Sequence, residues 1–61
     1  MAQYEVMWVN DSVIGSNGTQ RIPNASRLMN DMAMRGWTVH SVVPGTNAQT
    51  YSGLFITFYH D

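Results

Sequence analysis

The chain has 61 residues with three basic and four acidic side chains, a formal net charge of −1 and no cysteine. A chain of this length holds one hydrophobic core, so we expect a single domain over residues 1–61, and the absence of cysteine excludes disulfides and thiolate metal sites. Three dispersed arginines neutralise few phosphates, which argues against nucleic acid as a partner.

The first predicted element is a strand over residues 3–9. Tyr4, Val6 and Trp8 recur with the period of two that is typical of a strand with one well-buried face. Residues 10–23 follow and are rich in Asn, Ser and Gly, so most of this segment is expected to be loop. Within it, residues 13–14 and 21–22 are expected to pair as a small hairpin arm around residues 16–18.

A helix is predicted over residues 25–35. Asn24 and Ser26 are both good N-cap residues, and Gly36 suits the left-handed residue that follows a helix. A helix this short needs packing to persist in water, so it must lie on a sheet. The expected core stripe on its buried face comprises Leu28, Met29, Met32 and Ala33.

Two further strands are predicted after the helix, over residues 37–43 and 51–59. The first of them is expected to end at Pro44-Gly45. Its two sides comprise Trp37, Val39, Ser41 and Val43 on one and Thr38, His40 and Val42 on the other. The last strand is apolar on both sides.

These elements predict an α+β fold. A β-α-β-β chain packs most simply as a small antiparallel sheet of three strands with the one helix on one face, plus the hairpin arm in the 10–23 loop. One helix covers only one face of the sheet, so the other face is left open and apolar. We expect a homodimer or higher oligomer that buries this face, with an interface formed by Met7, Val9, Val42, Phe55 and Tyr59. In the alternative, both faces of the sheet are mixed in polarity, the arm folds over the sheet and the protein is monomeric.

Three segments resemble a known family. They are the opening Tyr4-Glu5-Val6-Met7, the helix end from Leu28 to Trp37, and the closing apolar strand. Together they resemble the small bacterial and phage family called domain of unknown function 4177, whose helix ends in a Leu-Asn motif followed by Gly-Trp-Glu. Asn30, Gly36 and Trp37 match this motif, whereas Thr38 stands where the family usually has Glu. The resemblance implies a fold and a bacterial or phage origin, and it implies no activity.

The three motif residues have structural roles on physical grounds. Gly36 allows a positive φ where the helix stops, and Trp37 packs under the helix end. Asn30 is expected to hydrogen-bond loop backbone from the flank of the helix. None of these roles is chemical.

The sequence lacks the motifs of an enzyme. It has no Gly-x-Ser-x-Gly, no glycine-rich phosphate loop and no metal-binding histidine pair. His40 is interpreted as a filler or interface residue on a strand, and His60 with Asp61 as a terminus that frays in solvent. We therefore expect no catalysis, no metal and no cofactor.

The compartment is predicted from the same composition. No apolar run approaches the roughly 18 residues of a membrane span, and the first residues lack the pattern of a secretory signal. We expect no membrane partner and a cytoplasmic location, which is the bacterial host cytoplasm if a phage encodes the chain.

Two classes of function remain. The first is a small non-enzymatic protein-interaction module that self-associates through its open sheet face and binds an unidentified cellular or host protein. The second is an oligomeric protein that binds or sequesters a nucleotide-like or aromatic anion between subunits, because aromatic faces with arginine suit such a ligand. The expected contacts to partner or ligand are Trp8, Arg21, Arg27, Met34, His40 and Tyr51, with Tyr59 also lining the ligand site.

Overall fold

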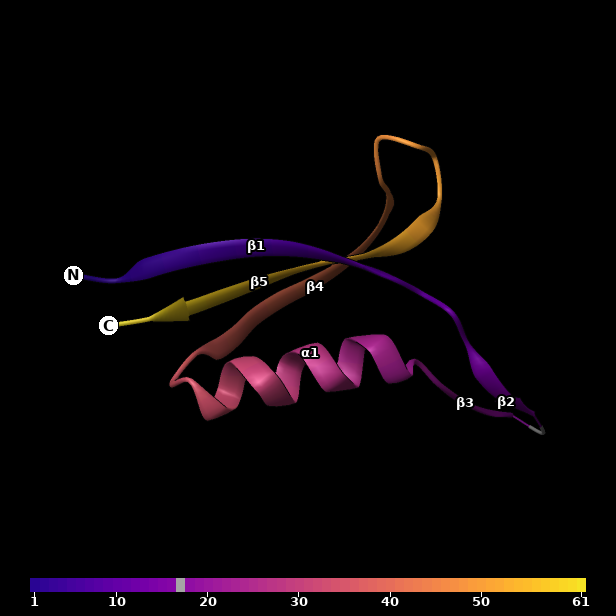
Figure 1. Ribbon diagram of the computed structural model, residues 1–61, viewed down its shortest axis with the longest axis horizontal. Coiled ribbons are helices and arrows are strands. Elements are labelled where there is room, and N and C mark those ends of the chain that lie inside the picture. The colour runs from indigo at the N-terminus through magenta and orange to yellow at the C-terminus, as the bar shows by residue number, and fades with distance from the viewer. Residues whose placement is uncertain (17) are drawn as a thin grey trace.

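A computed structural model describes residues 1–16 and 18–61 and confirms the α+β class. The chain forms six elements, which follow one another in the order strand, hairpin, helix and two strands (Figure 1). Their bounds are β1 Gln3–Asn10, β2 Ile14–Ser16, β3 Thr19–Arg21, α1 Pro23–Met34, β4 Thr38–Thr46 and β5 Ser52–His60. The predicted hairpin arm is confirmed as β2 and β3, and Asn17 lies outside the described residues.

The main sheet has the strand order β1-β5-β4, with β5 antiparallel to both neighbours. The last strand of the sequence is thus the central one, and β1 and β4 run parallel to each other on its two sides. The helix joins these two outer strands and lies along one face of the sheet (Figure 1). This confirms the predicted architecture of one helix on one face of a three-stranded sheet.

The helix begins two residues earlier than expected, at Pro23. Its N-cap is Ile22, which forms no side-chain capping bond, so Asn24 and Ser26 were wrong as caps. Proline at the first helical position explains the shift, because it lacks the N–H that would need a partner there and its φ is already helical.

The helix ends at Met34, one residue before the predicted end, and Gly36 after it takes the predicted left-handed conformation with a φ of +88°. The Gly36 N–H donates to the Ala33 carbonyl and the Trp37 N–H to the Met32 carbonyl, both at 3.0 Å. These two bonds form a Schellman motif, which satisfies carbonyls that the helix leaves free and needs a left-handed residue.

Strand β4 continues past Pro44 to Thr46, where the sequence predicted a stop. Just beyond the end of the β4–β5 ladder, the Asn47 N–H donates to the Tyr51 carbonyl at 3.1 Å. Backbone groups in an antiparallel pair alternate in direction, so Gly45 and Val43 also point their N–H and C=O groups toward β5. Pro44 is one of the alternate residues, whose N–H position faces outward. Its missing donor therefore costs the ladder no bond.

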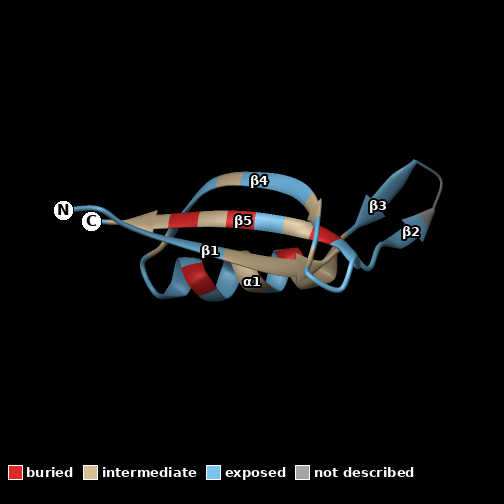
Figure 2. Cartoon of the chain, turned by 90° about the horizontal axis from the view of Figure 1, so that it is seen from above, coloured by how far each residue is buried: buried red, intermediate tan, exposed pale blue. Residues whose placement is uncertain are grey.

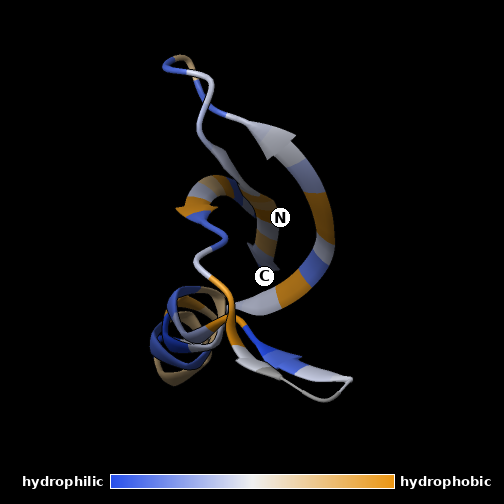
Figure 3. Ribbon diagram, turned by 90° about the vertical axis from the view of Figure 1, so that its right-hand side faces the viewer, coloured by the Kyte–Doolittle hydropathy of each residue, from blue (hydrophilic) through white to orange (hydrophobic). Residues whose placement is uncertain are grey.

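A β-bulge between Val39 and Ser41 also changes the predicted sides of β4. Before the bulge Val39 pairs with Phe58, and after it Val42 pairs with Ile56, so both valines face the helix. The inserted residue, His40, breaks the period of two. The strict alternation predicted for this strand is therefore wrong, and Figure 3 shows how strongly β4 curves along this stretch.

The core is small. Among the described residues only four hydrophobic side chains are buried, namely Ala25, Met32, Ile56 and Phe58. Partly buried side chains pack around them, including Met29 and Leu28 from the predicted helix stripe, but Ala33 is exposed and was wrongly placed in that stripe. Figure 2 shows the buried positions confined to β5 and to the side of α1 that faces it.

The molecule is thin and extended. It measures 42 × 25 × 15 Å with a radius of gyration of 12.6 Å, where about 10.5 Å is expected for a compact chain of this length. Its accessible surface is 4562 Å², against about 4,000 Å² for a compact monomer of 6.9 kDa. The fold therefore leaves more surface in water than a chain of this size normally does.

Candidate functional site

The face of the main sheet that lies opposite α1 is the strongest candidate site, and we call it the open face. The register places three rows of side chains across it, because directly paired residues in a sheet point to the same side. The rows are Trp8, Phe55 and Val43, then Val6, Thr57 and Ser41, then Tyr4, Tyr59 and Thr38. The central strand β5 contributes the middle member of each row.

An aromatic cluster occupies one end of the open face. The ring of His40 lies edge-on to both Tyr4 and Tyr59, with centroid distances of 6.1 Å, and the two tyrosines are also 6.1 Å apart. The bulge explains why His40 joins this cluster, since the extra residue leaves both Val39 and Val42 on the other side.

The other end of the open face is formed by Trp8 and Phe55, which lie over two glycines. The indole Nε1 of Trp8 donates to the Gly45 carbonyl at 3.2 Å, which carries the ring across β5. A side chain at Gly53 would collide with the Trp8 ring, and one at Gly45 would come within 2.8 Å of Phe55. The glycines thus make room for the aromatic rings to lie against the sheet.

The open face carries no Asp, Glu, Lys or Arg side chain among its described residues, and His40 is its one titratable imidazole. Glu5 is the only carboxylate in the three strands, and it pairs with Phe58 on the helix side. The face is also exposed: Tyr4 and Val6 are 61% and 62% accessible, and Val43 is 54% accessible. An accessible sheet face rich in aromatic and aliphatic side chains is typical of an interaction surface.

The predicted interface residues are divided between the two faces. Phe55 and Tyr59 lie on the open face as expected. Met7, Val9 and Val42 were placed there wrongly, because they pair with Ile56, Leu54 and Ile56 respectively and face the helix. The two β1 residues of this group, Met7 and Val9, pack against the core. Conversely, the alternation of Tyr4, Val6 and Trp8 marks the open face and not the buried one.

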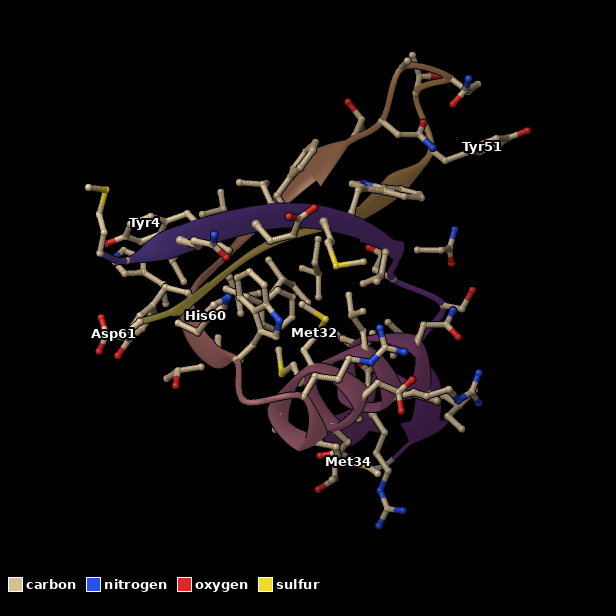
Figure 4. All side chains as sticks on the ribbon, turned by 60° about the vertical axis from the view of Figure 1, so that its left-hand side comes forward. Tyr4, Met32, Met34, Tyr51, His60 and Asp61 are labelled. Atoms are coloured by element: carbon tan, nitrogen blue, oxygen red, sulfur yellow. The ribbon has the colours of Figure 1, made fainter. Side chains whose placement is uncertain are left out.

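The predicted contact residues are not brought together into one ligand site. Trp8 and His40 lie on the open face, and Tyr51 projects from the β4–β5 turn, where Figure 4 shows it apart from Tyr4. Arg21 belongs to the arm and Arg27 to the helix, both away from the open face. Met34 is 84% exposed on the outer side of α1, whereas Met32 points toward the sheet (Figure 4).

Gly36 and Trp37 have the predicted structural roles, whereas the Asn30 side chain forms no hydrogen bond within residues 1–16 and 18–61, so its predicted bond to loop backbone is wrong. Trp37 packs against the core, and its ring stands edge-on to His60 with centroids 4.1 Å apart. His60 lies within β5, opposite Gln3, and is half-buried, so its side chain is not in open solvent as expected. Asn30 is exposed on the helix.

A second surface feature is a groove of about 710 Å³ between the arm and the start of α1. Its apolar lining includes Ile14, Ile22, Met29, Val42 and Leu54. The last two are helix-side residues of the sheet, so the arm lies beside the helix and not across the open face. The predicted position of the arm over the sheet, one part of the monomeric alternative, is therefore wrong, whereas the oligomeric state itself stays a prediction.

Two searches of the described residues and a comparison with known proteins bear on the site. Over residues 1–16 and 18–61, no three His, Cys, Asp or Glu side chains gather closely enough to hold a metal. In the same part of the chain no helix is long and apolar enough to cross a membrane. Comparison with family models, curated proteins and solved structures finds no match, so the resemblance to the domain of unknown function 4177 family stays a prediction.

Proposed function

We propose that the protein is a non-enzymatic self-association module whose open face packs against the open face of a second copy. The observation that carries this proposal is the composition of that face: six aromatic or aliphatic side chains accompany Thr38, His40, Ser41 and Thr57, with no Asp, Glu, Lys or Arg among the described residues. Without carboxylates, ammonium or guanidinium groups, the face has no permanent charge to repel the same patch of a second copy across a two-fold axis.

The small core supports the same proposal. Four buried side chains stabilise a domain poorly, and short chains without disulfides commonly depend on oligomers for the rest. Packing two sheets face to face would place both sets of aromatic side chains in a shared core about 10 Å thick. The stability of the fold and the association of its copies are then one property.

The alternative of a ligand site between subunits has less support. It requires an arginine beside the aromatic residues, because the expected ligand is an anion. Arg21 and Arg27 belong to the arm and to the helix, whereas the aromatic cluster lies on the opposite side of the sheet. A face-to-face dimer brings no arginine of its own to the interface.

Two predictions about the compartment and the source of the protein accompany this function. The assembly acts in the cytoplasm, and its source is a bacterium or a phage. Fractionation of cells that express the chain from its own gene tests the first of these predictions.

The proposal is tested by placing a charge at the centre of the open face. Thr57 occupies the middle row of the central strand, so Thr57→Lys forces a buried, unpaired ammonium into the proposed interface. We expect the dissociation constant to rise by at least about 100-fold, measured by native mass spectrometry across a dilution series. Ala33→Lys adds the same charge on the exposed side of α1 and serves as the matched control. Equal masses for the two variants and the wild type would contradict the proposal.

A further inference from the structure

The two edge strands of the main sheet, β4 and β1, differ in the features that hinder pairing with a strand of another chain. Edge β4 carries the bulge at His40 and has Pro44 at an outward position, and both features hinder pairing with another strand. Edge β1 runs for eight residues with neither device. Within residues 1–16 and 18–61 it pairs with β5 alone, and Figure 1 shows it along the outer margin of the sheet.

The hydrogen bonds reveal which backbone groups of β1 are free. Next to the ladder, the Asp11 N–H donates to the Ser52 carbonyl at 3.4 Å, which identifies the odd-numbered residues of β1 as those bonded to β5. The hydrogen bond from Asn47 to Tyr51 leads to the same assignment. It shows that the backbone groups of odd-numbered β5 residues point toward β4, so those of even-numbered β5 residues point toward β1. The N–H and C=O groups of Tyr4, Val6 and Trp8 therefore point away from the sheet.

We infer that β1 pairs with β1 of a second copy, antiparallel and around a two-fold axis at Val6. The outward groups of Val6 then bond to those of the partner's Val6, and those of Tyr4 bond to those of the partner's Trp8. In this register Glu5 lies opposite the partner's Met7. Shifting the axis to Glu5 would set two carboxylates opposite each other, which disfavours that register.

Edge pairing joins two sheets into one of six strands and leaves both open faces on the same side. This inference rests on the proposed function, because it supplies a second contact to copies that already associate through the open face. Three strands of eight residues form an open face with a projected area of about 390 Å². The edge of β1 adds backbone hydrogen bonds between copies, which face packing does not supply.

Edge pairing uses a two-fold axis perpendicular to the sheet. Where the two-fold axis of face packing runs across the strands and meets that axis at a right angle, the two contacts close into a tetramer with 222 symmetry. Its mass is four times the 6.9 kDa of one chain. Such a tetramer consists of two six-stranded sheets packed through their aromatic faces, with the helices outside.

Amide hydrogen exchange of the wild-type protein tests the edge directly. The N–H groups of Glu5, Met7 and Val9 bond to β5 in any state of assembly. Those of Tyr4, Val6 and Trp8 are protected only if the edge is paired, and we expect them to exchange about 100-fold more slowly than in an unstructured chain. An assembled protein in which these three amides exchange freely would overturn the inference, and so would a monomer.

Two substitutions at one position separate the edge from the face. Val6→Pro removes an outward N–H and leaves the ladder with β5 intact, and Val6→Ala trims the same side chain and keeps the N–H. Val6 is also a residue of the open face, so both variants lose a similar face contact and differ mainly in the edge N–H. We expect Val6→Pro to have half the mass of Val6→Ala at the same protein concentration.

Thr57→Lys should also halve the mass, but with the amides of Tyr4, Val6 and Trp8 still protected. Loss of face packing and loss of edge pairing are thus distinguishable, since each leaves a different dimer. If Val6→Pro fails to fold, exchange in the wild type still decides the matter. A full-mass Val6→Pro assembly would overturn edge pairing and leave the proposed face packing intact.

Discussion

The two faces of the main sheet are built from similar residues, but α1 covers one face and the other is exposed to solvent. Along β5, Leu54, Ile56 and Phe58 face the helix, and Ile56 and Phe58 are fully buried. The side chains of Phe55 and Tyr59 alternate with them, and Phe55 is 37% accessible. Hydrophobicity alone therefore does not distinguish a covered face from an open one. The difference lies in what packs on each face, which is α1 on one side and, in our proposal, a second copy on the other.

The largest expected effect comes from removing the same ring on each face. Phe58→Ala empties a fully buried site and should destabilise the fold by about 3–5 kcal/mol, which is most of the stability of a domain this small. Phe55→Ala should cost the isolated chain far less, because its ring is partly in water already. Urea denaturation at a concentration low enough to dissociate the assembly measures both. Equal losses would show that the two faces are equally buried within one chain.

A smaller effect is expected from filling the space below the aromatic rings of the open face. Gly53→Ala places a methyl group against the Trp8 ring and the Val9 backbone, and overpacking of this kind costs about 1–3 kcal/mol. Gly45→Ala meets only the edge of the Phe55 ring and should cost less. The emission spectrum of the variants reports displacement of Trp8. A Gly53→Ala variant as stable as the wild type would contradict the position of the Trp8 ring over Gly53.

A cost near 1 kcal/mol is expected at the helix end, which is remote from both faces. Gly36→Ala meets no atom within 4 Å, so its whole cost is the strain of a positive φ. Thermal unfolding should show this loss while native mass spectrometry shows an unchanged assembly. A shift in the assembly would mean that the helix end also takes part in association.

The smallest effect is expected from deleting His40. Without His40, the pair of Val39 with Phe58 is followed directly by the pair of Ser41 with Thr57, as in a regular antiparallel ladder. We therefore expect the free energy of unfolding to change by less than about 1 kcal/mol. Circular dichroism and urea denaturation measure this outcome. Unfolding of the variant would mean that the ring contacts with Tyr4 and Tyr59 are needed for the fold.

The sequence predicted the elements better than it predicted their sides. The helix end at Gly36 and the last strand follow from local chemistry, because a left-handed glycine and a period of two are visible in neighbouring residues. The side that each strand presents depends on distant partners. Met7 and Val6 are both apolar, and only pairing with Ile56 and Thr57 determines which of them meets the helix.

The bulge at His40 and the course of β4 through Pro44 were not predictable for a related reason. A bulge is a property of two paired strands, and a proline is tolerated in a strand only when its nitrogen faces outward. Neither fact can be read from one segment. The open face itself could be predicted from the count of elements, since one short helix covers one face of a three-stranded sheet.

The most direct test of the central claim is sedimentation equilibrium of the wild-type protein over a wide range of concentrations. If the open face is an interface between copies, the mass at high concentration is two or four times 6.9 kDa and falls on dilution. A mass of 6.9 kDa at every concentration would contradict the claim, because the open face would then remain in water in the native protein.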